Sequence, residues 1–169
     1  SRAGQLSEYI IRPDVAFFEV SPPDERGYMS FGPIGSYNGY FISQLASTVV
    51  AQVNKETPFV PGSREAFLHV SEVDYICEKD HKLPELPNVP ITEEDRKIAG
   101  FIAEQIPDGA CIQAGLGAIP NAVCMLLDIK KDLGVHAEMI SDGIVELVNK
   151  GVVNCSKKNF HYGRIVIPM

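Results

Sequence analysis

The sequence predicts an α/β fold with two open, mostly parallel sheets and flanking helices. Short apolar runs alternate with turns and helical patterns along the whole chain, as in proteins whose strands are joined by crossover helices. The second half reads as strand, helix, strand, helix, and a segment with three prolines separates it from the first half. We therefore expect two lobes, residues 1–85 and residues 86–169.

The first half contains short apolar runs that are typical of buried strands. These runs are rich in β-branched and aromatic residues, and polar or proline-containing turns separate them. The expected strands are residues 15–20, 48–54, 66–70 and 73–77. Residues 28–40, rich in glycine, serine and tyrosine, predict a loop that either faces a ligand or packs on the surface, and a short helix should follow at residues 41–47.

The second half begins after a proline-rich connector, residues 83–90, whose composition predicts an extended and semi-rigid segment. Thr92-Glu-Glu-Asp95 is similar to a capping box, so a helix should start there. Four apolar residues then recur at helical spacing and predict a packed helix face: Ile98, Phe101, Ile102 and Ile106.

Two further strand and helix pairs complete the second half. Pro120 should open the first of these helices and Gly151 should stop the second, positions that suit proline and glycine. The expected elements are a strand at residues 110–114, a helix at 120–130, a strand at 135–140 and a helix at 142–150. Because the chain starts at Ser1 and ends in a strand-like apolar run, we expect a fragment whose second lobe is incomplete.

Composition excludes several classes of function. The formal net charge is -7 and no dense Lys/Arg block occurs, which argues against nucleic acid as the main partner. No apolar run approaches the ~18 residues of a membrane span, so a cytoplasmic protein is expected. The 4 cysteines form no Cys-x-x-Cys pair and the histidines lie in unrelated contexts, so neither a disulfide framework nor a metal site is predicted.

The turn at Gly115-Leu-Gly117 lies between an expected strand and an expected helix. Glycines at this place let backbone N–H groups approach an anion or an oxyanion at the helix N-terminus. The turn is not a dinucleotide fingerprint, because Pro120 stands where the third glycine should be. A ligand-binding role and a tight turn needed only for packing both remain open.

A carboxylate in an apolar strand is the sharper functional signal. Glu138 has mostly apolar neighbours, and a carboxylate buried there is costly unless it is hydrogen-bonded or used. It is a candidate nucleophile or base, or it faces solvent on an edge strand. His136, two residues earlier, is either its hydrogen-bond partner or a structural histidine. Ser141 and Asp142 most simply cap the helix that follows.

Four ordered blocks of this sequence resemble the acetyl-CoA hydrolase/transferase family, and within it the 4-hydroxybutyrate and butyrate:acetate CoA-transferases. They span residues 20–32, 70–76, 115–123 and 134–143, the last reading Gly-Val-His-Ala-Glu-Met-Ile-Ser-Asp-Gly. The resemblance implies that Glu138 is the catalytic nucleophile. It also implies that an acyl or CoA pocket is lined by Gln113, Gly115, Leu116, Gly117, Ala118 and His136.

The resemblance further implies a reaction and its partners. The enzyme would transfer coenzyme A, as a substrate and without a metal, between an acyl-CoA and acetate, butyrate or 4-hydroxybutyrate through a glutamyl-CoA thioester. It would form a homodimer and need the remainder of the longer family chain. An acyl-CoA hydrolase that uses the same glutamate is the first alternative, and a non-catalytic ligand-binding or assembly fragment is the second.

Overall fold

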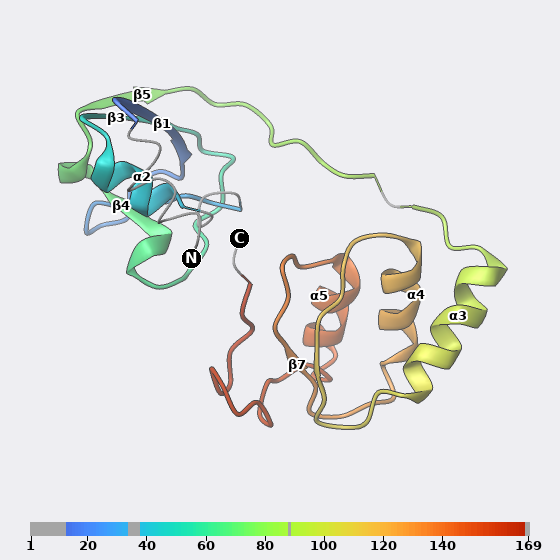
Figure 1. The fold of residues 1–169 in the computed structure, drawn as a ribbon. Helices are drawn as coiled ribbons and strands as arrows, with labels where there is room; N and C mark the ends of the chain where they lie inside the picture. Colours follow the sequence, from blue (N-terminus) through green and yellow to red (C-terminus); the bar gives the residue numbers. More distant parts are fainter. Residues whose placement is uncertain (1–12, 34–37, 88, 168–169) are drawn as a thin grey trace. The chain divides into compact units, whose positions relative to one another are not determined.

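The computed structural model describes residues 13–33, 38–87 and 89–167, which fall into two compact units (Figure 1). The first unit ends at Glu85 and the second begins at Leu86, within the proline-rich connector. Each unit contains strands and helices, so the α/β class predicted from the sequence is confirmed. No helix of the described part combines the length and apolarity that a membrane crossing requires.

A parallel sheet forms the centre of the first unit. Its order is β1-β3-β5, with β1 at Val15–Val20, β3 at Thr48–Val53 and β5 at Tyr75–Glu78. Both pairings are parallel, and Val20 lies opposite Val53 at the carboxyl end. The apolar runs in the sequence therefore located these strands within two residues.

A second, antiparallel pair in this unit corrects one prediction. Strand β2, Tyr28–Ser30, pairs with β4, Phe67–His69, although residues 28–30 were expected to belong to a loop. Three residues are too few for a pattern to mark a strand, and the partner lies far away in the sequence. The short helices of the unit are α2, Gly39–Leu45, and the 3₁₀ turns η1, Arg64–Ala66, and η2, Val70–Glu72.

The core of the first unit lies between the two sheets. Met29 of β2 and Leu68 of β4 are fully buried, and burial of each side chain contributes about 1.5–3 kcal/mol. Strand β3 buries alternate residues, as a half-covered strand does. The remaining buried apolar members of this core are Val20, Phe31, Val49, Ala51 and Val53.

The second unit packs helices around two short parallel strands. Its elements are α3 at Glu93–Glu104, β6 at Cys111–Ile112, α4 at Ala118–Leu126, β7 at Gly134–Val135 and α5 at Asp142–Asn149. Cys111 pairs with Gly134 and Ile112 with Val135. Single bridges lengthen the sheet on the other edge of β7, where Leu133 meets Val153 and His136 meets Val166.

The sequence predicted the start of α3 and the stop of α5 correctly. Thr92 accepts a hydrogen bond from the Asp95 amide and Asp95 accepts one from the Thr92 amide, which completes the predicted capping box. Gly151 follows α5 with a φ of 75°, as expected of a glycine stop. Pro120, however, is the third residue of α4 rather than the first, because Gly117 is the N-cap.

The predicted packing face of α3 is wrong for three of its four residues, while the fourth, Ile106, follows the end of the helix and packs against the core. The helix buries Ala99 and Ala103 against the core, whereas Ile98, Phe101 and Ile102 are 43%, 71% and 39% exposed. The small alanine side chains let α3 approach α4 closely, which the larger side chains would prevent. Apolar spacing therefore identified the helix but not the face that is buried in this structure.

Candidate active site

The carboxyl ends of β6 and β7 lie side by side in the second unit. The strands are in parallel register, and the His136 amide donates to the Ile112 carbonyl at 3.0 Å. Gln113 follows β6 and Glu138 follows β7, and both side chains are exposed. The two predicted turns therefore leave the sheet at the same edge, which is where ligands gather in open α/β sheets.

The glycine turn after β6 presents free backbone donors. The amides of residues 114–117 donate to no described backbone carbonyl. Gly117 has φ 127° and ψ −178°, a conformation that side chains rarely adopt, and it is the N-cap of α4. A Cβ added at Gly115 would meet no atom within 4 Å, so packing does not require glycine at that position. The turn therefore has both the donors and the open space that an anionic ligand atom needs.

A cavity of about 280 Å³ lies beside this turn. Gln113 and Gly115 of the turn line it together with Pro120, and most of the other lining side chains are apolar. Leu116 is 43% exposed, and Ala118 is half-buried at the start of α4. Neither Glu138 nor His136 lines this cavity. The two turns are therefore neighbours at the sheet edge, but they do not enclose one common cavity.

Glu138 does not lie inside a strand, which corrects the sequence prediction. Strand β7 ends at Val135, His136 forms one bridge, and Glu138 begins the exposed loop that leads to α5. The strand is short because β6 ends at Ile112 and cannot continue the ladder beside residues 137–140. The Glu138 carboxylate accepts no hydrogen bond from the described side chains or amides, so it is accessible to a substrate.

Of the two roles left open for His136, a hydrogen bond to Glu138 is not made within the described part of the chain. Its exposed ring stacks on Phe160, with ring centroids 6.3 Å apart and an angle of 11° between the planes. His161 lies edge-on at 6.5 Å. Phe160 and His161 belong to a loop that no motif in the sequence singled out, so this aromatic cluster was missed.

Ser141 occupies the predicted N-cap of α5 but does not cap it with its side chain. The side-chain oxygen is buried and has no hydrogen-bond partner among the described residues. The backbone is tightly packed here, because a Cβ added at Gly143 would come 2.6 Å from the Cβ of Cys124. Burial raises the pKa of the Cys124 thiol and outweighs the opposing effect of the nearby Ser141 hydroxyl, so the neutral thiol is favoured.

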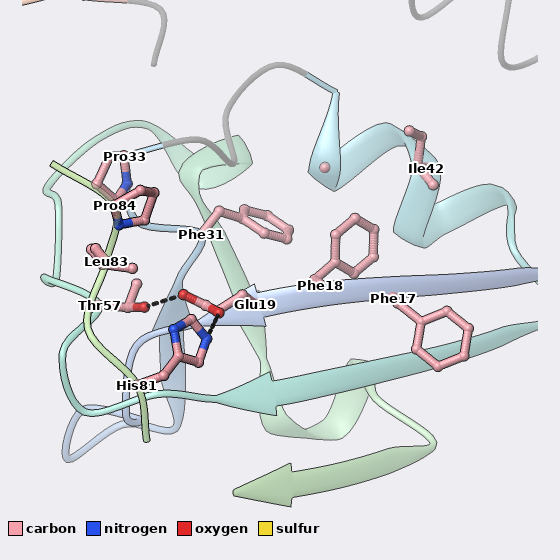
Figure 2. Close-up of a pocket in the computed structure, with 11 residues that line it drawn as sticks. Phe17, Phe18, Glu19, Phe31, Pro33, Ile42, Thr57, His81, Leu83 and Pro84 are labelled. Carbon is pink, nitrogen blue, oxygen red and sulfur yellow. Dashed lines mark hydrogen bonds and ion pairs between the residues drawn. The ribbon is translucent and has the colours of Figure 1, made fainter. Parts of the chain in front are cut away.

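The first unit contains a separate polar cluster at the carboxyl end of its sheet (Figure 2). Oε1 of Glu19 accepts from Thr57 at 2.9 Å and from Asn54 at 3.2 Å, while Oε2 pairs with Nε2 of His81 at 2.7 Å and accepts from Gln52 at 3.2 Å. This cluster borders a cavity of about 510 Å³ whose other lining residues are mostly apolar and include Phe17, Phe18, Phe31, Ile42 and Leu83.

Glu19 and His81 each stabilise the charged form of the other. Burial raises the pKa of Glu19, but the hydrogen bonds from Thr57 and Asn54 and the pair with His81 outweigh it, so this pKa lies below its ordinary value. The pKa of His81 is raised, chiefly by its hydrogen bond to the Lys82 carbonyl and next by its pair with Glu19. A charged residue near the end of an apolar strand was the signal used for Glu138, and it would also have found Glu19.

No group of His, Cys, Asp and Glu side chains within the described ranges is arranged to hold a metal ion. Cys77 and Cys111 are exposed free thiols, whereas Cys124 and Cys155 are buried free thiols.

Comparisons with known proteins identify relatives over nearly the whole chain. The 4-hydroxybutyrate coenzyme A transferase of Clostridium kluyveri is 46% identical over 91% of this chain and 35% of its own length. The succinyl-CoA:cyclohexane-1-carboxylate CoA transferase of Geobacter metallireducens is 45% identical over 90% of this chain and 34% of its own length. The chain thus spans about a third of the length of these curated relatives.

Solved structures give the same result. RipA from Yersinia pestis matches 99% of this chain and 38% of its own chain, with a TM-score of 0.93 and 38% identity. A 4-hydroxybutyrate CoA-transferase from Porphyromonas gingivalis matches 99% of this chain and 42% of its own, with a TM-score of 0.89 and 36% identity. The family model for the acetyl-CoA hydrolase/transferase N-terminal domain matches residues 1–88. This chain therefore belongs to the acetyl-CoA hydrolase/transferase family.

Proposed function

We propose that the protein containing this chain transfers coenzyme A between an acyl-CoA and a short-chain carboxylic acid, with Glu138 as the nucleophile. The observation that supports it best is the shared sheet edge: an accessible carboxylate follows β7, and a turn with free amides follows β6. The two curated relatives and the Porphyromonas gingivalis protein described above are named as CoA transferases, which agrees with this assignment.

A carboxylate nucleophile suits this reaction. An oxygen of Glu138 attacks the thioester carbonyl, the carbon–sulfur bond of the resulting tetrahedral adduct breaks, and CoA leaves as a thiolate while the acyl group stays on Glu138 as a mixed anhydride. The thiolate then attacks the glutamyl carbonyl of the anhydride, which releases the donor acid as a carboxylate and leaves a glutamyl-CoA thioester. The acceptor carboxylate reverses these steps, so CoA is transferred with no net gain or loss of a proton.

The glycine turn would serve the charged intermediates of each step. Amides of residues 115–117 would donate to the oxyanion that forms at the attacked carbonyl, and such a donor is typically worth about 2.7–4 kcal/mol. Gln113, Leu116 and Ala118 would form the adjoining wall of the acyl or CoA pocket, and His136 its opposite rim. The acid is acetate, butyrate or 4-hydroxybutyrate in this proposal.

Borohydride trapping tests the role of Glu138. The complete protein is incubated with acetyl-CoA or butyryl-CoA and then reduced, which converts a glutamyl thioester to an alcohol that peptide mass spectrometry can locate. We expect the modification at Glu138 and its loss, together with CoA exchange, in Glu138→Ala. Glu146→Ala, which removes an exposed carboxylate on α5, is the matched control. Modification at another residue would refute the assignment.

Hydrolysis of acyl-CoA is the second candidate, because Glu138 is exposed and water can reach it in this structure. A hydrolase would release CoA from acetyl-CoA with no acceptor acid present, whereas a transferase would not. If Glu138→Ala left CoA exchange intact, a non-catalytic ligand-binding or assembly role for this segment would be favoured instead.

We also propose that the complete protein is a cytoplasmic homodimer and that each of the two units belongs to a separate lobe. The family resemblance supports the dimer. Light scattering of the complete protein after size exclusion measures its mass directly, and a monomer would refute this part of the proposal.

A further inference from the structure

Lys158 is the only charged side chain that is buried among the described residues, with 7% of its surface exposed. Burying an ammonium group is costly unless hydrogen bonds replace the lost water. The neighbouring Lys157, by contrast, is exposed. The burial of Lys158 therefore requires a structural explanation that its polar sequence context does not give.

The ammonium of Lys158 is held by two main-chain carbonyls. Nζ donates to the Val135 carbonyl at 2.8 Å and to the Arg164 carbonyl at 2.8 Å. The stem of the side chain lies over Gly134, where an added Cβ would come 2.6 Å from Cγ of Lys158. Gly134 is thus the residue that leaves room for the lysine beside β7.

These hydrogen bonds complete the free edge of β7. Val153 and Val166 bridge to that edge at Leu133 and His136, and the chain between them loops away from the strand. The Val135 carbonyl accepts both from Lys158 and from the Val166 amide at 3.2 Å, and the Ala137 amide donates to Val166 at 3.0 Å. The backbone is therefore held on both sides up to Ala137.

The same loop provides the ring that covers His136. Phe160, two residues after Lys158, stacks on the His136 imidazole. The loop is closed by the Gly163 amide, which donates to the Cys155 carbonyl at 3.0 Å. Lys158 thus ties together the strand that precedes Glu138 and the loop whose Phe160 packs on His136.

We propose that Lys158 is a positioning residue for Glu138. Its ammonium fixes the backbone hydrogen bonds that precede the loop of Glu138, and this restricts the direction in which the Glu138 side chain points. The same contacts hold Phe160 against His136. This inference rests on the proposed function of Glu138. A misplacement of about 1 Å can lower a rate about 100-fold, so a firm support is needed even though Lys158 does not touch the substrate.

Three variants of the complete protein test the proposal. Lys158→Met keeps the stem and removes the donors, so kcat should fall about 10-fold to 100-fold while KM for acyl-CoA changes less than about twofold. Lys158→Arg should recover part of kcat, because a guanidinium can donate to both carbonyls. Lys157→Met, which removes the same charge from an exposed position, should leave kcat unchanged.

Gly134→Ala provides an independent test should Lys158→Met not fold. Its methyl group displaces the lysine stem without removing the charge, and kcat should fall as in Lys158→Met. The rate of borohydride-trapped adduct formation at Glu138 should fall in parallel. A folded Gly134→Ala or Lys158→Met variant with wild-type kcat and wild-type adduct formation would overturn the inference. Absence of an adduct at Glu138 in the wild type would instead refute the proposed function.

Discussion

Replacement of Gly143 by alanine sets two opposing effects against each other. Alanine is favoured over glycine in a helix by about 1 kcal/mol, so propensity alone predicts a more stable α5. The structure predicts the opposite, because the new Cβ would lie 2.6 Å from Cβ and 3.3 Å from Sγ of Cys124, well inside the optimal separation of about 3.5–4.0 Å. Backbone-linked atoms make this contact, so rotation of a side chain cannot relieve it.

The magnitudes favour the steric effect. Overpacking of a close contact costs about 1–3 kcal/mol, and the propensity gain offsets about 1 kcal/mol of it, so Gly143→Ala should lose up to about 2 kcal/mol of stability. Gly100→Ala in α3 is the matched control, because a Cβ there would meet no atom within 4 Å. It should gain about 0.5–1 kcal/mol.

Urea denaturation of the complete protein, with hydrogen exchange of α5 peptides, measures both changes. Gly143→Ala should lower the denaturation midpoint and increase exchange in α5, and a shift of that helix should also lower the rate of CoA exchange. Gly100→Ala should raise the midpoint. The reasoning would be refuted if Gly143→Ala were at least as stable as the wild type, since a 2.6 Å contact could then be relieved at no cost.

The Glu19–His81 pair should make the free energy of unfolding depend on pH. Its contribution is lost as the pH falls below 4.5 and Glu19, whose pKa is lowered, becomes protonated. It is also lost as the pH rises above 6.5 and His81, whose pKa is raised, loses its proton. The difference in urea midpoint between wild type and His81→Gln should therefore be largest between these values, and a difference independent of pH would contradict it. Asn54→Ala should lower the free energy of unfolding, measured by urea denaturation, by about 2–3 kcal/mol. The buried Asn54 side chain donates hydrogen bonds to the Glu19 carboxylate and to the His81 carbonyl, and it accepts one from the His81 amide. Ser141→Ala should cost nothing or stabilise the protein by up to about 1 kcal/mol, because the buried side-chain oxygen of Ser141 has no hydrogen-bond partner among the described residues. Thr92→Ala should lose about 1 kcal/mol, because it removes the capping box of α3. A lower thermal midpoint for Ser141→Ala than for Thr92→Ala would refute both assignments.

Local signals in the sequence were sufficient for several elements. The apolar run of β1 and the Thr92 capping box depend on neighbouring residues, and both were located correctly. The length of β7 depends instead on partners elsewhere in the chain. Residues 135–140 have strand composition, but β6 ends at Ile112, so the ladder stops and Glu138 lies in a loop.

The candidate site could be predicted only in part for the same reason. The glycine turn and Glu138 were found because each has an unusual residue type at a strand end. Lys158 was missed because its sequence neighbours are polar and predict an exposed residue. Lys158 can be buried because Gly134, distant in the sequence, has no side chain to fill the same space. The sequence alone does not show that these two residues are neighbours.

The edge of β7 has a consequence for the order of folding. Its neighbours come from distant parts of the chain: Cys111 and Ile112 on one side, and Val153 and Val166 on the other. Contacts between distant residues form slowly, because each requires a long loop to close first. During synthesis, the backbone before Glu138 therefore stays without its second neighbour until Val166 has left the ribosome, so the site should be among the last parts of this unit to form.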